Sequence, residues 1–169
     1  EDVTHVENTI NPLNDIQVIE TELLLSDLSK VENIIENLQK KNKGKKIDSF
    51  YIDTLNLIQK EVSEGITINQ ISLSSKQADY IKTFNFLTFK PYLFVCNVDE
   101  TSIITGNKFS EIVFDNAKKK NVNSLLVSAS IESEISIMEN EEEKIEFLNS
   151  VGLQETSLTK LAREGYSLL

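Results

Sequence analysis

Tyr92-Leu93-Phe94-Val95-Cys96, followed directly by Asn97-Val98-Asp99-Glu100, is the stretch that decides the fold of this 169-residue chain. The first part is an uninterrupted apolar run, which is typical of parallel strands that are covered on both faces. A second buried run is predicted over Ser124 to Val127, and its apolar residues Leu125-Leu126-Val127 lead into Ser128-Ala129-Ser130. Between the runs, Phe109 to Lys120 predicts an amphipathic helix with Phe109, Ile112, Val113 and Ala117 facing inward. Two parallel strands joined by a helix form a right-handed βαβ unit, so this part of the chain is predicted to be α/β.

A helical hairpin is predicted before this unit. Its first helix extends from about Asn14 to Lys41, with Asn11 as a plausible N-cap, and its second from about Ile47 to Glu64. Apolar residues recur with the alternating spacing of four and three that is typical of a coiled coil: Leu24, Leu28, Val31, Ile35 and Leu38 in the first helix, and Tyr51, Leu55, Ile58 and Val62 in the second. At about 1.5 Å per residue the first helix is roughly 40 Å long, so we expect an antiparallel coiled-coil arm.

Charge is unevenly distributed along the chain. The net charge of −10 argues against general affinity for nucleic acids, and no specificity for DNA is expected. The predicted turn of the hairpin nevertheless concentrates five lysines: Lys40, Lys41, Lys43, Lys45 and Lys46. The segment from Ile131 to Glu146 is, by contrast, strongly acidic. Loop lysines often do no more than keep a turn solvated, but at the end of an arm they favour contact with a polyanion such as RNA.

The composition disfavours several classes of site and protein. Cys96 is the only cysteine and His5 the only histidine, which excludes an internal disulfide and most zinc sites. No apolar stretch is long enough for a transmembrane helix, and Glu1-Asp2-Val3-Thr4 does not resemble a signal peptide. We therefore expect a cytoplasmic protein without membrane contact.

Polar residues follow both predicted strands. In an open parallel sheet, ligands bind outside the carboxyl ends of the strands, where Asn97 and Ser128 are placed. An asparagine amide offers one acceptor and two donors, which suits a purine, although Asn97 could also do no more than cap the following turn. The phosphate-binding half of such a site is missing, because no two of the five glycines are close enough to build a phosphate-binding loop: Gly44, Gly65, Gly106, Gly152 and Gly165.

At this point the chain resembles the YchF-type ATPases, a branch of the Obg-related P-loop GTPases. The resemblance extends over essentially the whole length and rests on these residues: Thr4-His5-Val6, Asn11-Pro12, Asp15-Ile16, Thr21-Glu22-Leu23, the basic turn, Phe86-Leu87-Thr88, Lys90-Pro91, Asn97 to Glu100, Ser128-Ala129, and Leu161 through Tyr166. The family has a P-loop NTPase domain that is interrupted by a helical coiled-coil arm and followed by a TGS domain. The resemblance implies that residues 1–13 and 87–169 belong to the nucleotide-binding domain and residues 14–86 to the arm and its return. The P-loop segment and the TGS domain are then missing partners of this chain.

For the base site, the resemblance implies roles for five residues. Asn97 would hydrogen-bond the base, Val98 would pack on it or contact it, and Ser128 with Ala129 would close the other side. Ordinary GTPases have lysine at the position of Val98, and at the position of Glu100 an aspartate that accepts from guanine N1–H and N2–H₂. Glu100 is one methylene longer, and it is expected to face solvent or to hold the loop. The resemblance therefore implies that adenine is tolerated or preferred.

The resemblance also implies the function of a ribosome-associated P-loop ATPase. ATP or GTP with Mg²⁺ would be bound by the intact protein, and the lysine-rich turn would contact the ribosome or RNA. No catalytic residue and no metal ligand is assigned to this chain, which we expect to be inactive alone and to hold no cofactor tightly. One alternative is a stand-alone helical interaction module that binds no nucleotide, and another is a truncated pseudo-NTPase.

Overall fold

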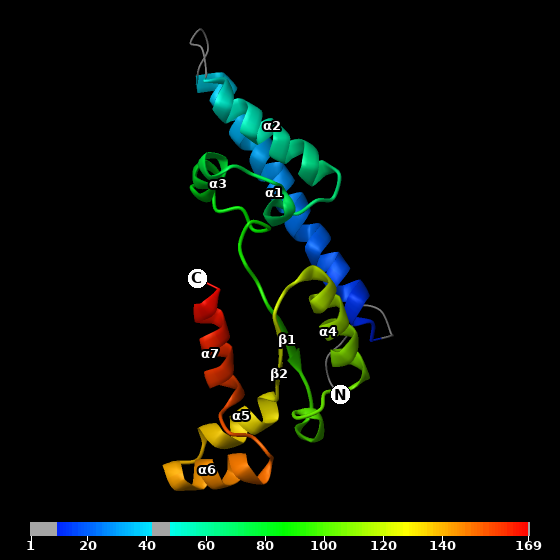
Figure 1. The fold of residues 1–169 in the computed structure, drawn as a ribbon, viewed down its shortest axis with the longest axis vertical. Coiled ribbons are helices and arrows are strands. Elements are labelled where there is room, and N and C mark those ends of the chain that lie inside the picture. Colours follow the sequence, from blue (N-terminus) through cyan, green and yellow to red (C-terminus); the bar gives the residue numbers. More distant parts are fainter. Residues whose placement is uncertain (1–9, 42–47, 169) are drawn as a thin grey trace. The chain divides into compact units, whose positions relative to one another are not determined.

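The computed structural model describes residues 10–41 and 48–168. It contains two compact units, one formed by Asp15–Pro91 and one built around Tyr92–Leu169 (Figure 1). The first unit is helical, and the second holds a two-stranded parallel sheet with helices packed around it. The predicted α/β class is therefore confirmed for the second unit.

The helical unit is an antiparallel pair of long helices, α1 (Pro12–Lys41) and α2 (Ser49–Ser63). The Asn11 side chain accepts a hydrogen bond from the Asn14 N–H at 3.3 Å, so it caps α1 as predicted. α2 is capped by Asp48, whose carboxylate accepts from the Phe50 N–H at 3.0 Å. α2 runs back beside α1 (Figure 1), and buried residues of the two helices share one core.

The core of this unit draws on more than the two helices. Several residues of the predicted coiled-coil spacing are buried: Val31, Ile35, Leu55, Ile58 and Val62. The same cluster includes residues of the returning chain: Ile68 of η1 (Ile68–Gln70), Ile81 of α3 (Ser75–Lys82) and Phe86. Tyr51 is 38% exposed and packs against Tyr80 of α3, with ring centroids 4.7 Å apart. The returning chain thus covers part of the apolar contact between α1 and α2. An isolated two-helix coiled coil has no such third segment.

A buried carboxylate attaches the returning chain to α1. Asp27 is 1% exposed and accepts hydrogen bonds from the Leu87 N–H at 2.8 Å and the Thr88 N–H at 2.7 Å. The Thr88 hydroxyl donates to the same carboxylate at 2.8 Å and accepts from the Ile68 N–H at 3.2 Å. Because unpaired polar groups in a core are costly, this network defines where residues 68 and 87–88 lie on α1.

The second unit contains the predicted βαβ arrangement. β1 (Phe94–Asn97) pairs in parallel with β2 (Ser124–Val127), and α4 (Lys108–Lys120) lies between them in the chain. β2 has the predicted bounds, whereas β1 begins later than predicted and includes Asn97. Val113 and Ala117 of α4 are buried as predicted. Ile112 is 40% exposed, so its predicted inward position is wrong.

Three further helices belong to this unit: α5 (Ala129–Ser136), α6 (Glu141–Ser150) and α7 (Ser157–Ser167). Their core is a cluster of buried apolar residues: Val98, Ile103, Ile131, Ile135 and Leu148. Glu132 of α5 accepts from the Ser157 N–H at 2.6 Å, which attaches the start of α7 to α5. Within the described residues, no helix is long and apolar enough to cross a membrane.

Candidate functional site

The carboxyl ends of the two strands lie side by side. Asn97 ends β1 in register with Val127, which ends β2, and the Val98 N–H donates to the Val127 carbonyl at 2.9 Å. The Asn97 side chain reaches the start of α5, directly after β2, where its Oδ1 accepts from the Ala129 N–H at 3.0 Å. The structure therefore brings together Asn97 and Ala129, two of the residues that the sequence places in a base site.

This hydrogen bond determines which end of the Asn97 amide stays available. A backbone N–H needs an acceptor, so Oδ1 must face Ala129 and the NH₂ group must face elsewhere. Asn97 is exposed, and its NH₂ group offers two donors at the carboxyl edge of the sheet. Adenine and guanine both present an acceptor at N7, which such a donor fits.

A second hydrogen bond joins the segment after β1 to the start of α5. Ser130, near the start of α5, donates from its hydroxyl to Oε1 of Glu100, the first residue of η2 (Glu100–Ser102). The carboxylate of Glu100 thereby lies near the N-terminus of α5, where negative charge is favoured. Glu100 is exposed and is linked to the start of α5 by this hydrogen bond. From the sequence, Ser130 is placed only in the segment after the second strand. Its pairing with Glu100 could not be predicted from spacing, because thirty residues separate the two.

Ser128 lies below this surface. It is fully buried, and its Oγ has no hydrogen-bond partner among the described residues. It precedes α5 without capping it through its side chain. Ala129 and Ser130 are exposed, so the start of α5 presents these two residues outward and the Ser128 hydroxyl inward.

Val98 belongs to the core. It is 8% exposed and packs in the same cluster as Ile131 and Ile135 of α5. Its side chain therefore lies on the opposite face of the chain from the exposed Asn97, as expected for consecutive residues of extended backbone.

Asp99 caps η2. Its Oδ1 accepts from the Thr101 hydroxyl at 2.7 Å and from the Ser102 N–H at 2.9 Å. The hydrogen bonds that Asp99 accepts from Thr101 and Ser102 lower its pKa below the usual value. The carboxylate of Asp99 thus stabilises the conformation of its own loop.

The predicted RNA-contacting lysines belong to the helical unit. Lys40 and Lys41 lie in the last turn of α1, where positive charge is favoured. The Lys40 ammonium forms an ion pair with Glu36 at 3.0 Å. Lys43, Lys45 and Lys46 lie outside the described residues.

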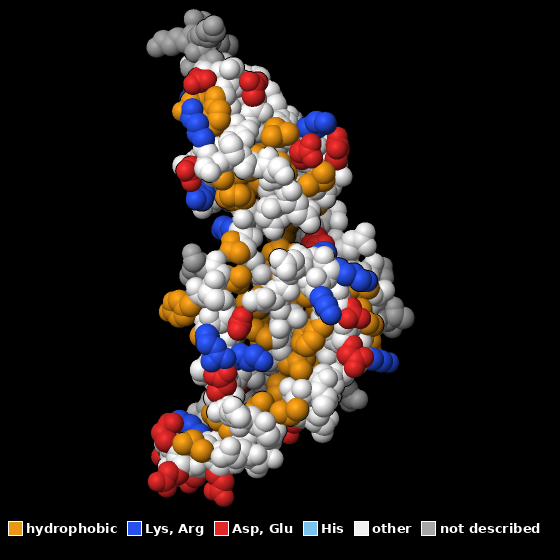
Figure 2. All heavy atoms as spheres, viewed as in Figure 1, with side chains coloured by type: hydrophobic (Ala, Val, Ile, Leu, Met, Phe, Trp, Pro, Cys, Tyr) orange, Lys and Arg blue, Asp and Glu red, His pale blue; other side chains and the backbone are white. Residues whose placement is uncertain are grey.

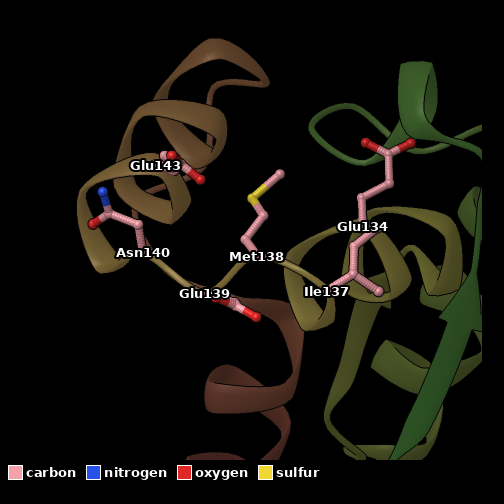
Figure 3. A pocket seen from close by; sticks show the side chains of 6 residues that line it. All are labelled: Glu134, Ile137, Met138, Glu139, Asn140 and Glu143. Carbon is pink, nitrogen blue, oxygen red and sulfur yellow. The ribbon is translucent and has the colours of Figure 1, made fainter.

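A hollow of about 630 Å³ lies between α5 and α6 (Figure 3). Glu134 and Glu143 lie on its two sides, and the Met138 side chain projects into the space between them (Figure 3). Figure 2 shows acidic side chains gathered over the same region of α6. Carboxylates repel nucleotide phosphates, so this hollow suits a nucleotide poorly and the strand ends remain the candidate site.

Named relatives match the chain over its whole length. Ribosome-binding ATPase YchF of Haemophilus influenzae is 37% identical over 170 residues, which cover 100% of this chain and 46% of that protein. The protein of the same name from Bacillus subtilis is 33% identical and is covered to 47%. The chain thus spans about half the length of the curated relatives it matches. No family model matches the chain.

A solved structure shares the fold. The YchF GTPase of Schizosaccharomyces pombe matches with a TM-score of 0.84 at 22% identity, over 99% of this chain and 47% of that one. A helical hairpin followed by a parallel strand pair is consistent with part of a P-loop GTPase-like α/β fold. The whole-length identity and the shared fold together show that the chain is similar to a part of the YchF proteins.

Proposed function

We propose that this chain supplies the purine-binding loops of a ribosome-associated P-loop NTPase that binds and hydrolyses ATP or GTP. The hydrogen bond from the Ala129 N–H to Asn97 Oδ1 carries the proposal, because it leaves the Asn97 NH₂ group as a donor where parallel sheets bind ligands. The names of the relatives, an ATPase and a GTPase, support this class of reaction.

Within the proposed site, Asn97 donates to N7 of the base, and Ala129 closes the opposite side at the start of α5. Ser128 supports this turn from below, since its side chain is fully buried. Val98 holds the loop from the core and does not contact the base, since it is 8% exposed. N7 is common to both purines, so Asn97 contributes affinity and leaves the choice between adenine and guanine to other residues.

The phosphates and Mg²⁺ are proposed to bind to other parts of the longer protein. Within the described residues, no group of three or more His, Cys, Asp or Glu side chains could hold a metal ion. The chain also has no pair of close glycines for a phosphate-binding loop. We therefore assign neither a metal ligand nor a catalytic residue to it, and we expect the chain alone to be inactive.

We further propose that the hairpin of α1 and α2 acts as an arm whose lysine-rich turn contacts ribosomal RNA. Lys40 and Lys41 end α1 at this turn, and Lys43, Lys45 and Lys46 follow in the sequence. Lysines bind RNA mainly by neutralising phosphates. The relatives that are named as ribosome-binding support this partner. We expect the protein to act in the cytoplasm, where ribosomes are found.

The base site is tested by replacing Asn97→Ala in the full-length protein and titrating ATP by calorimetry. Loss of the N7 contact should weaken ATP binding about tenfold, which corresponds to about 1.4 kcal/mol. Asn149→Ala, an exposed residue of α6, is the control and should bind ATP as the unchanged protein does. Equal affinity of the Asn97 variant and the control, with both folded by circular dichroism, would favour the alternative of an interaction module without nucleotide binding.

A further inference from the structure

We propose that Ser130 is a positioning residue that sets the base preference of the site by holding the carboxylate of Glu100 away from the base. This inference rests on the proposed purine site. The observation behind it is the hydrogen bond that the Ser130 hydroxyl donates to Glu100 Oε1 across the two loops.

The position of Glu100 makes its carboxylate the group that could choose between purines. It follows Asn97 by three residues in the same loop, and Asn97 provides the donor for N7. Asp99 is less suited to this role, because its Oδ1 already accepts from Thr101 and Ser102 of η2 as the cap of that helix. Within the described residues, Glu100 forms no ion pair with a lysine or arginine. The hydroxyl of Ser130 is therefore the group that orients its carboxylate.

The two purines respond oppositely to a free carboxylate at their Watson–Crick edge. Guanine presents two donors there, N1–H and N2–H₂, and a carboxylate can accept from both at once. Adenine presents one donor, N6–H₂, beside an acceptor at N1, which repels a carboxylate. A carboxylate that is free to face the base therefore favours guanine, and one that is turned away removes the penalty for adenine.

In this chain Ser130 turns the carboxylate toward the start of α5. The hydrogen bond engages Oε1, and the N-terminus of α5 attracts the negative charge in the same direction. Bidentate acceptance from guanine needs both oxygens to face the base in one plane, which this arrangement disfavours. The Ser130–Glu100 pair thus shifts the site toward ATP, without either residue contacting the phosphates.

The experiment compares Ser130→Ala with unchanged full-length protein by titrating ATP and GTP separately. Removing the hydroxyl frees the Glu100 carboxylate, so the ratio of GTP to ATP dissociation constants should fall at least about fivefold. Ser133→Ala, an exposed serine one turn further along α5, should leave the ratio unchanged. In a Glu100→Ala background, the Ser130→Ala change should not alter this ratio further, because the carboxylate that it would release is absent.

The outcomes separate this inference from the proposed function. If Asn97→Ala weakens ATP binding but Ser130→Ala leaves the GTP to ATP ratio unchanged, the role of Ser130 is overturned and the base site stands. A ratio that falls equally with and without Glu100 would also overturn it, since the effect would not pass through the carboxylate. If the unchanged protein binds neither nucleotide, the base site and this inference fall together.

Discussion

At the scale of single residues, the exposure of each side chain decides whether it can contact a ligand. Asn97, Asp99 and Glu100 are exposed, whereas Val98 between them is only 8% exposed and faces the core. The role of Asn97 at the strand end could be predicted from residue type and position. The placement of Val98 could not be taken from the resemblance, because it depends on the apolar surface of α5, a helix that the sequence pattern does not predict.

Asp27 is a residue whose burial can be suspected from the sequence but whose partners cannot be predicted from it. It lies three residues after Leu24, on the face of α1 that the coiled-coil spacing predicts to be apolar. An acidic residue on such a face signals a buried partner, but its partners Leu87 and Thr88 lie sixty residues away and cannot be found from spacing.

We predict that Asp27→Ala strongly destabilises the helical unit. It would leave the buried Thr88 N–H without an acceptor and remove two further hydrogen bonds to the same carboxylate. The free energy of unfolding should fall by about 2–4 kcal/mol, as measured by urea denaturation. Asp53→Ala, at an exposed position of α2, is the control and should change it by less than about 0.5 kcal/mol. Similar losses in the two variants would mean that the buried network contributes little.

At the scale of elements, most helices and strands were predictable from the sequence, and α5 was not. α1 and α2 lie close to their predicted ranges, and β2 matches its range. α5 has eight residues, and its buried positions Ile131 and Ile135 give a single four-residue spacing. One such spacing is too little to separate a helix from a loop, so Ser128-Ala129-Ser130 reads as a loop although it begins a helix.

The start of α4 gives a prediction at this scale. Gly106 has a φ of +76°, and a Cβ there would lie 2.6 Å from Ser110 Oγ. That oxygen completes the capping box of α4 with Asn107, accepting from its N–H at 2.8 Å. Gly106→Ala should therefore combine backbone strain with a lost cap and cost about 2–4 kcal/mol in urea denaturation.

Gly65→Ala is the matched control for this change. Gly65 has a φ of +88°, but no heavy atom lies within 4 Å of a Cβ built there. It should cost only the backbone strain, about 1–2 kcal/mol. Equal losses at the two glycines would show that the capping box of α4 adds nothing.

At the scale of the whole molecule, positive and negative charges are concentrated in two different segments of the chain. The lysines cluster at the turn of the hairpin, whereas the region of α5 and α6 is acidic. The positions of the charged residues along the sequence predict this separation. It does not predict the bonds between the two loops of the base site, because those depend on which residues the parallel pairing brings together.

The lysine-rich turn is tested with a matched pair of double variants of the full-length protein. Lys45→Gln with Lys46→Gln should weaken binding to ribosomal RNA and lower the slope of log affinity against log salt concentration by about one to two. Lys118→Gln with Lys119→Gln, in the last turn of α4, makes the same charge change elsewhere. Fluorescence anisotropy over a salt series measures both. Equal slopes in the two variants would leave the turn lysines as solvating residues.

The most direct test of the central claim is photolabelling of the full-length protein with 8-azido-ATP, followed by mass spectrometry of tryptic peptides. The azide lies beside N7 of the base, so it should react near the Asn97 amide and the start of α5. The account predicts label in the peptide from Thr83 to Lys108 or in that from Asn121 to Lys144, competed by unmodified ATP. Competed label confined to other peptides would contradict the base site.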